Sequence, residues 1–588
     1  MRRLILLTGL AAVYSIDCLA DEAWSLNSVS SPTFDLLGKG RSAAGVRGNS
    51  LVLDGTGLVK LTDSAKLASQ VDGFTLMVWV NPYRLSAGQQ MIAAKNRYSL
   101  GERQWSVMID EDNHFRLYVF QGRWVTASAK VLPKPGHWHL IGVVVRKASA
   151  ELWVNGRKAG DVELKKPVPQ TAAPVTLGGV DDNGRIRQNF EGAIDEVRLV
   201  ERPLPAEQLA TAYQPVPATH SIPNRPDPVR LWTGSQLPSI AEATVLKDVQ
   251  FRVIKRYEPE ADGYGFLHGV AVVWHKGRLY SSFGHNKGSE NTFTEEGRFC
   301  VSDDGGKSWS SVTTIDPVDD SRDHAVSHGV FLSHNDTLWA FLGSFHQTRK
   351  RVHTRAYILN EETGHWQPQG TVIDGGFWPM SQPVRMEDGN WIMPGFIVGN
   401  GNPAAVAISQ GDDLRSWRAV TIAAGPQVRS MWGESAVIVN GPKILNIARY
   451  GSRPIALIAE SVDYGRTWSH SVESNLPMAA SKPCSGVLSN GQRYLICSTT
   501  ADGRNRRSPL TIAVSAPGKD TFSRLFVIRH AVFEDGPGES DPGAALSYPY
   551  AVEHQGHLYV GYSNNGNRSG NNNSAELAII PVRSLAVD

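Results

Sequence analysis

A hairpin pattern that recurs six times in the C-terminal part of the chain most strongly constrains the fold. Each copy has a lead residue, a short apolar run, a polar turn containing Gly or Asn, and a second apolar run, which is typical of a β-hairpin. The intervals between successive lead residues are 60, 53, 53, 51 and 63 residues. Short strands that repeat at about 50 residues predict a β-propeller, here with six blades over residues 231–588. The six lead residues are His268, His328, Ser381, Glu434, Ser485 and Tyr548.

A second repeat supports the propeller. Residues 302–309 and 461–468 share the form S-x-D-x-G-x-[ST]-W, and residues 409–417 are a degenerate copy. In such a turn the Asp accepts backbone amides, the Gly allows a positive φ, and the Trp packs between blades. We therefore expect structural roles for Asp304 and Asp463.

The region before the propeller predicts a separate all-β domain. The chain has 588 residues, more than one hydrophobic core usually supports. Residues 21–213 contain short strand patterns such as Phe74–Val80, separated by turn signals, which predict an antiparallel sandwich. Residues 214–230 are rich in proline and are interpreted as a semi-rigid linker.

The motifs of this first domain resemble the laminin-G/concanavalin-A-like jelly roll. The resemblance includes Leu53-Asp54-Gly55, Trp138–Val143 and Phe190–Val197. It leaves both a glycan-facing accessory role and a purely structural role open. Asp54 and Asp195 are either members of a structural Ca²⁺ site or turn and strand-end residues. No other cofactor is expected, and no Cys/His spacing typical of a zinc site occurs in the sequence.

The S-x-D-x-G-x-[ST]-W turns resemble the Asp boxes of the sialidase superfamily, whose members are six-bladed propellers. These enzymes use a Tyr activated by a Glu as nucleophile, an Asp as acid/base, and three arginines that hold the substrate carboxylate. A carboxylate near a phenol can take its proton, and arginine binds carboxylates in a bidentate manner. By order and spacing the resemblance implies Tyr548 as nucleophile, Glu434 as its base, and Arg449 and Arg507 as substrate ligands, with Arg504 and Arg506 competing for the last role.

The first predicted blade departs from the sialidase pattern. It has His268-Gly-Val where the family has Arg-Ile-Pro, and the expected Asp is missing. Arg252 lies too far upstream to replace the arginine. A long polar segment, residues 283–296, follows where the acid/base belongs, so Glu290 or Glu295 is the candidate replacement, with a solvated loop as the alternative.

Other polar residues of the first two blades are candidates for the pocket. His285 and Asn286, in the same polar segment, are candidate substrate-binding residues. His268 and His328 begin adjacent hairpins with the same His-Gly-Val sequence, so they either face the pocket or are packed and satisfied. Histidine and tyrosine also serve as the proton-transfer groups of uronate lyases.

The sequence therefore predicts an exported retaining exo-glycosidase that acts on a terminal acidic sugar of glycans. The alternatives are a propeller polysaccharide lyase that uses His268 and Tyr548 on uronate-containing glycans, and a non-catalytic glycan-binding protein. The net charge of +2 gives no reason to expect nucleic acid as a partner.

The first 20 residues are interpreted as a secretory signal peptide. Arg2-Arg3 precedes the apolar run Leu4–Tyr14, which is too short for a membrane span, and Cys18-Leu19-Ala20 fits a cleavage site. We therefore expect a secreted or periplasmic protein. Cleavage leaves three cysteines, an odd number, which allows either one disulfide bond or three free thiols. They are Cys300, Cys484 and Cys497, and a bond would join the last two.

Overall fold

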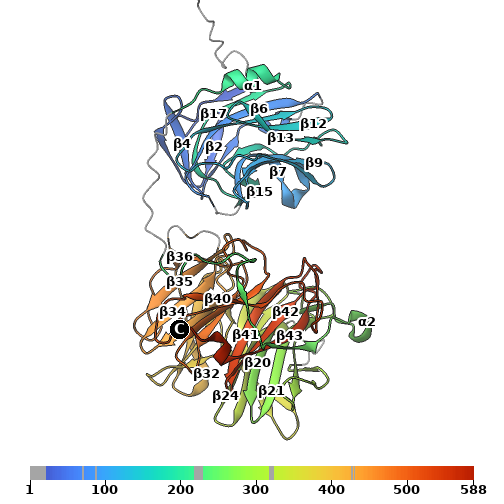
Figure 1. Ribbon diagram of the computed structural model, residues 1–588, viewed down its shortest axis with the longest axis vertical. Helices are drawn as coiled ribbons and strands as arrows, with labels where there is room; N and C mark the ends of the chain where they lie inside the picture. Colours follow the sequence, from blue (N-terminus) through green and yellow to red (C-terminus); the bar gives the residue numbers. More distant parts are fainter. Residues whose placement is uncertain are drawn as a thin grey trace, which may run out of the picture. The chain divides into compact units, whose positions relative to one another are not determined.

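The computed structural model describes residues 22–68, 72–85, 89–216, 229–316, 324–425, 428 and 431–587. The chain forms two compact units, divided between Pro226 and Asp227. Almost all regular structure in both units is β-strand (Figure 1). The predicted all-β class, with a sandwich followed by a six-bladed propeller, is confirmed. The expected signal peptide and residues 217–228 of the expected linker lie outside the described residues.

The first unit is a sandwich of two antiparallel sheets that enclose one apolar core, which includes Phe74, Trp105 and Phe115. In β9 (Phe115–Phe120) alternate residues are buried, because successive side chains of a strand point to opposite faces. The first sheet runs in the order β13 (Arg157–Glu163), β12 (Ser149–Val154), β11 (His139–Val145), β6 (Phe74–Pro82), β17 (Glu191–Val200), β4 (Asn49–Asp54), β3 (Gly40–Ala44), with β1 (Glu22–Trp24) beside β17. The second runs β10 (Trp124–Ser128), β9 (Phe115–Phe120), β8 (Glu102–Ile109), β7 (Gln90–Arg97), β14 (Val175–Leu177), β5 (Leu58–Leu61), β2 (Phe34–Leu37). The hairpin β15 (Val180–Asp182) and β16 (Arg185–Arg187) and the helix α1 (Ala206–Ala212) complete the unit.

The second unit consists of six small sheets, one for each predicted blade. Blades one to three are β20 (Phe266–His275), β21 (Arg278–Asn286), β22 (Glu295–Ser302), β23 (Thr313–Thr314); β24 (His324–His334), β25 (Thr337–His346), β26 (Lys350–Asn360), β27 (His365–Ile373); and β28 (Phe377–Pro379), β30 (Trp391–Ile397), β31 (Ala404–Gln410), β32 (Asp413–Thr421), with β29 (Val384–Arg385) beside β30. Blades four and five are β33 (Ser435–Asn440), β34 (Lys443–Arg449), β35 (Ile455–Ser461), β36 (Val472–Pro477); and β37 (Cys484–Val487), β38 (Arg493–Cys497), β39 (Leu510–Val514), β40 (Arg524–Arg529), joined by β18 (Thr244–Val245). Blade six is β41 (Leu546–His554), β42 (His557–Asn564), β43 (Ser574–Pro581) and β19 (Gln250–Lys255).

The ring is closed by a strand from the start of the unit. β19 pairs with β43, so residues from both ends of the unit share blade six, and the short helix α2 (Pro259–Asp262) leads from β19 toward blade one. The first strands of several neighbouring blades contact each other, for example β20 with β24 and with β41. The predicted lead residues lie in or next to these first strands, which brings residues hundreds of positions apart to one central site.

The Asp-containing turns have the geometry that a structural role requires. Asp304 Oδ1 accepts the amides of Lys307 and Ser308 at 3.0 and 2.9 Å. Asp463 accepts the equivalent amides of its own turn, and these hydrogen bonds outweigh partial burial and lower the pKa of its carboxyl to about 2. Both carboxylates are therefore occupied within their turns.

The two carboxylates proposed for a Ca²⁺ site in the first unit are also bonded to the chain itself. Asp54 accepts hydrogen bonds from the amide and hydroxyl of Thr56. Asp195 accepts the amides of Val46 at 2.7 Å and of Glu196 at 2.9 Å. These bonds favour the turn and strand-end alternative. Within the described ranges, no group of three or more His, Cys, Asp or Glu side chains is arranged to hold a metal ion.

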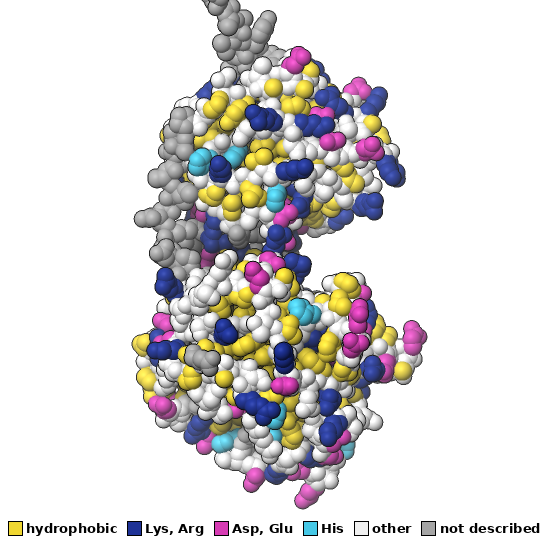
Figure 2. Space-filling view, viewed as in Figure 1, with side chains coloured by type: hydrophobic (Ala, Val, Ile, Leu, Met, Phe, Trp, Pro, Cys, Tyr) yellow, Lys and Arg dark blue, Asp and Glu magenta, His cyan; other side chains and the backbone are white. Residues whose placement is uncertain are grey.

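The three cysteines that follow the expected cleavage site are buried free thiols. Cys484 and Cys497 lie on the paired strands β37 and β38, but they do not form the disulfide bond that was one of the two alternatives. Among the described residues, no helix is long and apolar enough to cross a membrane. On the face seen in Figure 2, acidic and basic side chains are interspersed.

Candidate active site

A tyrosine and a glutamate from different blades form the centre of the candidate site. Tyr548 lies on β41, and Glu434 directly precedes β33. The Tyr548 hydroxyl donates a hydrogen bond to Glu434 Oε1, which also accepts Trp432 Nε1 at 2.9 Å. Arg449, at the end of β34, donates from Nη1 to Glu434 Oε2 at 2.9 Å and to the Tyr548 oxygen at 3.3 Å. The structure thus brings together three of the residues that the sequence selected.

The charges around this pair set its resting protonation. Burial alone would raise the pKa of Glu434, but Arg449, the Tyr548 hydrogen bond and Arg507 outweigh it and hold the pKa below its usual value. Burial, followed by the negative charge of Glu434, raises the pKa of Tyr548 well above its usual value. A neutral phenol therefore faces a charged carboxylate, which can accept its proton when the oxygen attacks.

The backbone at Tyr548 is strained. Its φ of 53° is in the left-handed region, which costs an ordinary L-residue about 1–2 kcal/mol. The pairing of β41 with β42 is interrupted by a bulge between Ser547 and Tyr550. Bulges redirect side chains, and strained non-glycine residues cluster at functional sites. This conformation supports a functional role for Tyr548.

A second arginine approaches the pair from blade five. The guanidinium of Arg507 lies 5.8 Å from the centre of the Tyr548 ring and donates to the Ala480 carbonyl at 2.9 Å. Its two competitors, Arg504 and Arg506, are exposed. Arg252, on β19, bonds to Gln250 and to its neighbour's carbonyl. Arg507 is therefore the arginine of this group that lies beside Tyr548.

A third arginine near the pair is not marked by any sequence pattern. Arg349 lies in the connection between β25 and β26, and its guanidinium is 5.1 Å from the centre of the Trp432 ring. Arg449 lies 5.9 Å from the same ring. Burial raises the pKa values of the carboxyls of Glu290 and Glu295, and the charge of Arg349 partly opposes this rise. No repeat or motif marks this position, so only the path of the connection could reveal it.

The two histidines that begin blades one and two both lie beside Tyr548. The ring centres of His268 and His328 are 3.9 and 5.8 Å from that of Tyr548. Burial holds the pKa of His268 well below its usual value and lowers that of His328 to about 4, so both are neutral at neutral pH. Asn573 Nδ2, which also donates to the Leu267 carbonyl, faces His268 Nδ1 at 3.2 Å. The same Nδ2 also donates to the Asn571 carbonyl at 3.0 Å.

The two acid/base candidates occupy different environments. Glu295 is fully buried, where its carboxyl accepts hydrogen bonds from the Ser327 hydroxyl and, at 2.9 Å, from the Asn291 amide. Burial raises its pKa to about 8. Glu290 is exposed as a residue and accepts Asn571 Nδ2 at 2.9 Å. Its carboxylate is nevertheless crowded by protein, which raises its pKa, and it experiences the charges of Arg349, Glu434 and Arg507.

The structure does not bring His285 and Asn286 into the centre of the site. The His285 ring stacks on Tyr264 with centres 4.2 Å apart, and Arg298 Nη1 lies 3.2 Å from its Nδ1. Asn286 bonds to Ser289 and to other residues of its own turn. Their polar atoms are therefore engaged within and beside the polar segment, and substrate contact by these two residues stays a prediction.

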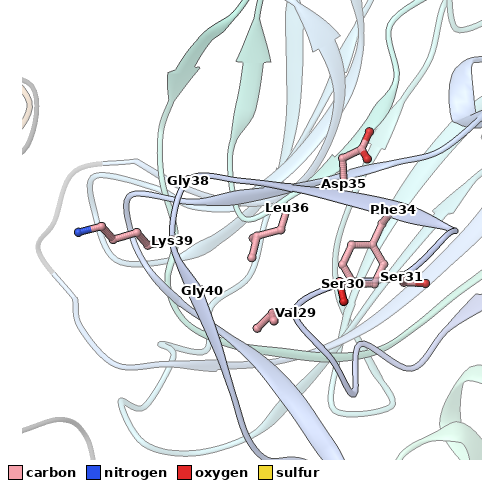
Figure 3. A pocket seen from close by; sticks show the side chains of 9 residues that line it. All are labelled: Val29, Ser30, Ser31, Phe34, Asp35, Leu36, Gly38, Lys39 and Gly40. Carbon is pink, nitrogen blue, oxygen red and sulfur yellow. The ribbon is translucent and has the colours of Figure 1, made fainter.

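A pocket of about 610 Å³ in the first unit lies at one edge of the second sheet, around β2 and the turn that follows it. Figure 3 shows Leu36 and Val29 beside this space, while the charged ends of Asp35 and Lys39 point outward. Its lining contains one acidic side chain and no histidine or cysteine. It lacks a tyrosine–carboxylate pair like that of the propeller site.

Comparisons with known proteins agree with the two domain types. Residues 296–560 match the family described as BNR repeat-like domain, and residues 53–210 match the concanavalin A-like lectin/glucanases superfamily. The resemblances inferred from the sequence are thereby confirmed at the level of fold. None of the curated proteins matches the chain.

The solved structures that the chain resembles are distant in sequence. A NanB sialidase from Streptococcus pneumoniae is 11% identical, with 91% of this chain and 98% of that chain covered and a TM-score of 0.40. A leech intramolecular trans-sialidase in complex with 2,7-anhydro-Neu5Ac is 11% identical, with 94% and 98% covered and a TM-score of 0.43. A Trypanosoma rangeli sialidase is 16% identical, with 58% and 60% covered and a TM-score of 0.42.

Proposed function

We propose that the propeller is a retaining exo-glycosidase of the sialidase type that removes a terminal acidic sugar from a glycan. The observation that carries the proposal is the buried Tyr548–Glu434 pair, in which a neutral phenol donates to a charged carboxylate. A neutral nucleophile avoids the repulsion that a carboxylate would meet from an anionic sugar, and tyrosine nucleophiles are the known exception to the two-carboxylate scheme. Residues 1–20 support the further proposal that the enzyme is exported.

The proposed reaction has two displacements. The Tyr548 oxygen attacks the anomeric carbon while Glu434 takes the phenol proton, the glycosidic bond breaks, and Glu290 gives a proton to the departing oxygen. Water then attacks the glycosyl–tyrosine intermediate, Glu290 takes the proton of that water, and Glu434 returns a proton to Tyr548. The two inversions leave the anomeric configuration unchanged.

Three arginines supply the charge that an acidic sugar needs. Arg449 and Arg507 flank Tyr548, and Arg349 shares the Trp432 ring with Arg449. Guanidinium groups bind carboxylates through two parallel hydrogen bonds. His268 occupies the position where the family has its first arginine, and its buried imidazole is neutral where the family has a cation.

Replacing Arg349 by Met is expected to raise KM for an anionic substrate with little change in kcat. Loss of one hydrogen-bonded charge contact of about 1.5–3 kcal/mol corresponds to roughly a 10- to 100-fold higher KM. The measurement is steady-state kinetics at constant ionic strength. Lys350→Met is the matched control, because Lys350 is the exposed neighbouring cation. Equal KM values for Arg349→Met and the wild type would remove Arg349 from the site.

Replacing Glu290 by Gln is expected to slow cleavage of alkyl glycosides about 100-fold, the lower end of the usual contribution of acid/base catalysis. An aryl glycoside has a good leaving group that needs little protonation, so its first step should be much less affected. The test compares the two substrate types in the same variant. An equal effect on both would exclude Glu290 as the acid.

A lyase is the second candidate, and the position of His268 favours it. Its neutral ring lies 3.9 Å from that of Tyr548, so a base and a phenolic acid are adjacent. In such a reaction a base removes the proton α to a uronate carboxylate, whose developing charge cations stabilise.

Product analysis by mass distinguishes the candidates. The substrates are sialosides, ketodeoxy-sugar glycosides and glucuronate-containing glycans. Hydrolysis adds one water across the cleaved bond, whereas elimination adds none and leaves an unsaturated uronate that absorbs in the near ultraviolet. That absorbance would refute the hydrolase. Measurable binding with every saccharide recovered intact would refute both reactions and support a glycan-binding protein.

A further inference from the structure

A buried lysine that the proposed reaction does not use contacts the two residues that follow Tyr548. Lys482 lies two residues before β37, the first strand of blade five, and is 0% exposed. Its Nζ donates to the Pro549 carbonyl at 2.6 Å and to the Pro483 carbonyl at 3.2 Å, and lies 3.7 Å from the centre of the Tyr550 ring. Among the described residues no carboxylate forms an ion pair with it. Burying an ammonium without a counter-ion costs folding free energy, which suggests that the charge has a role at this position.

The atoms that Lys482 holds belong to the strained segment at Tyr548. Pro549 follows Tyr548 directly, and Tyr550 is the residue at which pairing with β42 resumes after the bulge. A residue before proline is driven toward extended conformations, and the left-handed region is unfavourable for a tyrosine. The φ of 53° at Tyr548 therefore needs support from its surroundings. Lys482 gives that support from the neighbouring blade.

We propose that Lys482 is a positioning residue for the nucleophile: by holding the Pro549 carbonyl and the Tyr550 ring, it fixes the bulge that places the Tyr548 hydroxyl against Glu434. The positioning itself follows from the contacts of Lys482. The effect of this positioning on catalysis rests on the proposed function.

The groups around the ammonium make its effect dependent on pH. Burial lowers the pKa of Lys482 to about 8, against the opposing influence of Cys484, Glu434 and Cys497. The positive charge of Lys482 in turn lowers the pKa values of His268 and His328. The ammonium is therefore present at neutral pH and is lost as pH rises through about 8. We expect kcat to fall over that range because a neutral amine donates a weaker hydrogen bond to the Pro549 carbonyl.

The first unit contains a matched lysine for comparison. Lys95 is also 0% exposed, and its Nζ donates to the carbonyls of Ser64, Ala65 and Ala173 at 3.3, 2.6 and 2.7 Å. Burial lowers its pKa to about 8 as well. Lys95→Met therefore removes a similar buried cation from the other compact unit.

The test compares the full-length wild type, Lys482→Met and Lys95→Met by crystal structure and by kinetics with the 4-methylumbelliferyl glycoside of N-acetylneuraminic acid. In Lys482→Met we expect the Tyr548 backbone to leave the left-handed region and its hydroxyl to lose Glu434. The kcat should fall about 100-fold, as a misplacement of ~1 Å can cause, with KM nearly unchanged. The wild-type decline of kcat near pH 8 should persist in Lys95→Met and vanish in Lys482→Met.

A Tyr548–Glu434 contact that superimposes in wild type and Lys482→Met would overturn the inference. If Lys482→Met does not fold, wild-type crystals on either side of pH 8 replace it: movement of the Pro549 carbonyl is expected, and an unchanged bulge would overturn the inference. If the wild type does not cleave the 4-methylumbelliferyl glycoside, the comparison of the wild-type and Lys482→Met crystal structures alone decides the inference. Full activity of Tyr548→Phe would instead reject the proposed function.

Discussion

Tyr548→Phe is expected to lose kcat by about 10³-fold or more while the propeller stays folded, because the variant lacks the attacking oxygen. The phenylalanine ring keeps the packing against His268 and below Arg507. Glu434 keeps its hydrogen bonds from Trp432 and Arg449, so no buried charge is left unpaired. The loss of one hydrogen bond should therefore lower the free energy of unfolding by only about 1 kcal/mol.

Tyr357→Phe is the matched control for this loss. Tyr357 is also buried, in blade two, and its hydroxyl donates to the Asp316 carboxylate at 2.8 Å. It should show a similar small change in thermal unfolding and an unchanged kcat. Near wild-type turnover in Tyr548→Phe would reject both the hydrolase and the lyase as written, since each needs the phenol.

The propeller could be predicted because its signal is local and repeated. Each hairpin contains its own apolar strands and turn, so six copies define six blades without knowledge of any long-range contact. Glu434 and Arg449 belong to one such hairpin, and the pairing of β33 with β34 brings them together. The position of Tyr548 near these two residues could also be predicted, because closure of a ring brings the first strands of all blades to one centre.

The remaining parts of the site depend on contacts that no repeat encodes. Arg349 reaches Trp432 only through the course of a connection in blade two. Glu290 and Glu295 differ in environment because Ser327 of the next blade bonds to Glu295 inside the protein. His285 was expected in the pocket, yet Tyr264, from the segment before blade one, stacks on its ring. Such side-chain contacts between segments are set by packing.

Glu434→Gln is expected to lower kcat by roughly 10²- to 10⁴-fold, because an amide cannot accept the phenol proton. It should also destabilise the propeller, in contrast to Tyr548→Phe. Arg449 would keep its charge in a largely buried position without its carboxylate partner, and breaking such a pair costs about 3 kcal/mol or more. The measurements are kcat and the free energy of unfolding by denaturant.

Glu295→Gln provides a matched comparison at the same level of burial. The pKa of about 8 means that the Glu295 carboxyl is mostly protonated at neutral pH, so a glutamine resembles its resting form. We expect a small loss of stability there, and a kcat much closer to wild type than that of Glu434→Gln. A loss of kcat as large as that of Glu434→Gln would instead return the acid/base role to Glu295.

The pH dependence of stability gives these two variants opposite trends. The pKa of Glu434 is depressed in the folded state, so its carboxylate stabilises the protein above the unfolded pKa of about 4.3, and this stabilisation is lost as pH falls through the lower folded value. The loss of stability in Glu434→Gln should therefore become smaller at acidic pH.

The pKa of Glu295 is raised in the folded state, so the contribution of its protonated carboxyl to stability is complete below about pH 4.3 and is lost as pH rises through about 8. Glu295→Gln does not titrate and should gain stability relative to wild type over that range. Parallel trends in the two variants would mean that the two carboxyls share one protonation state, which would contradict the assignment of Glu434 as the charged base.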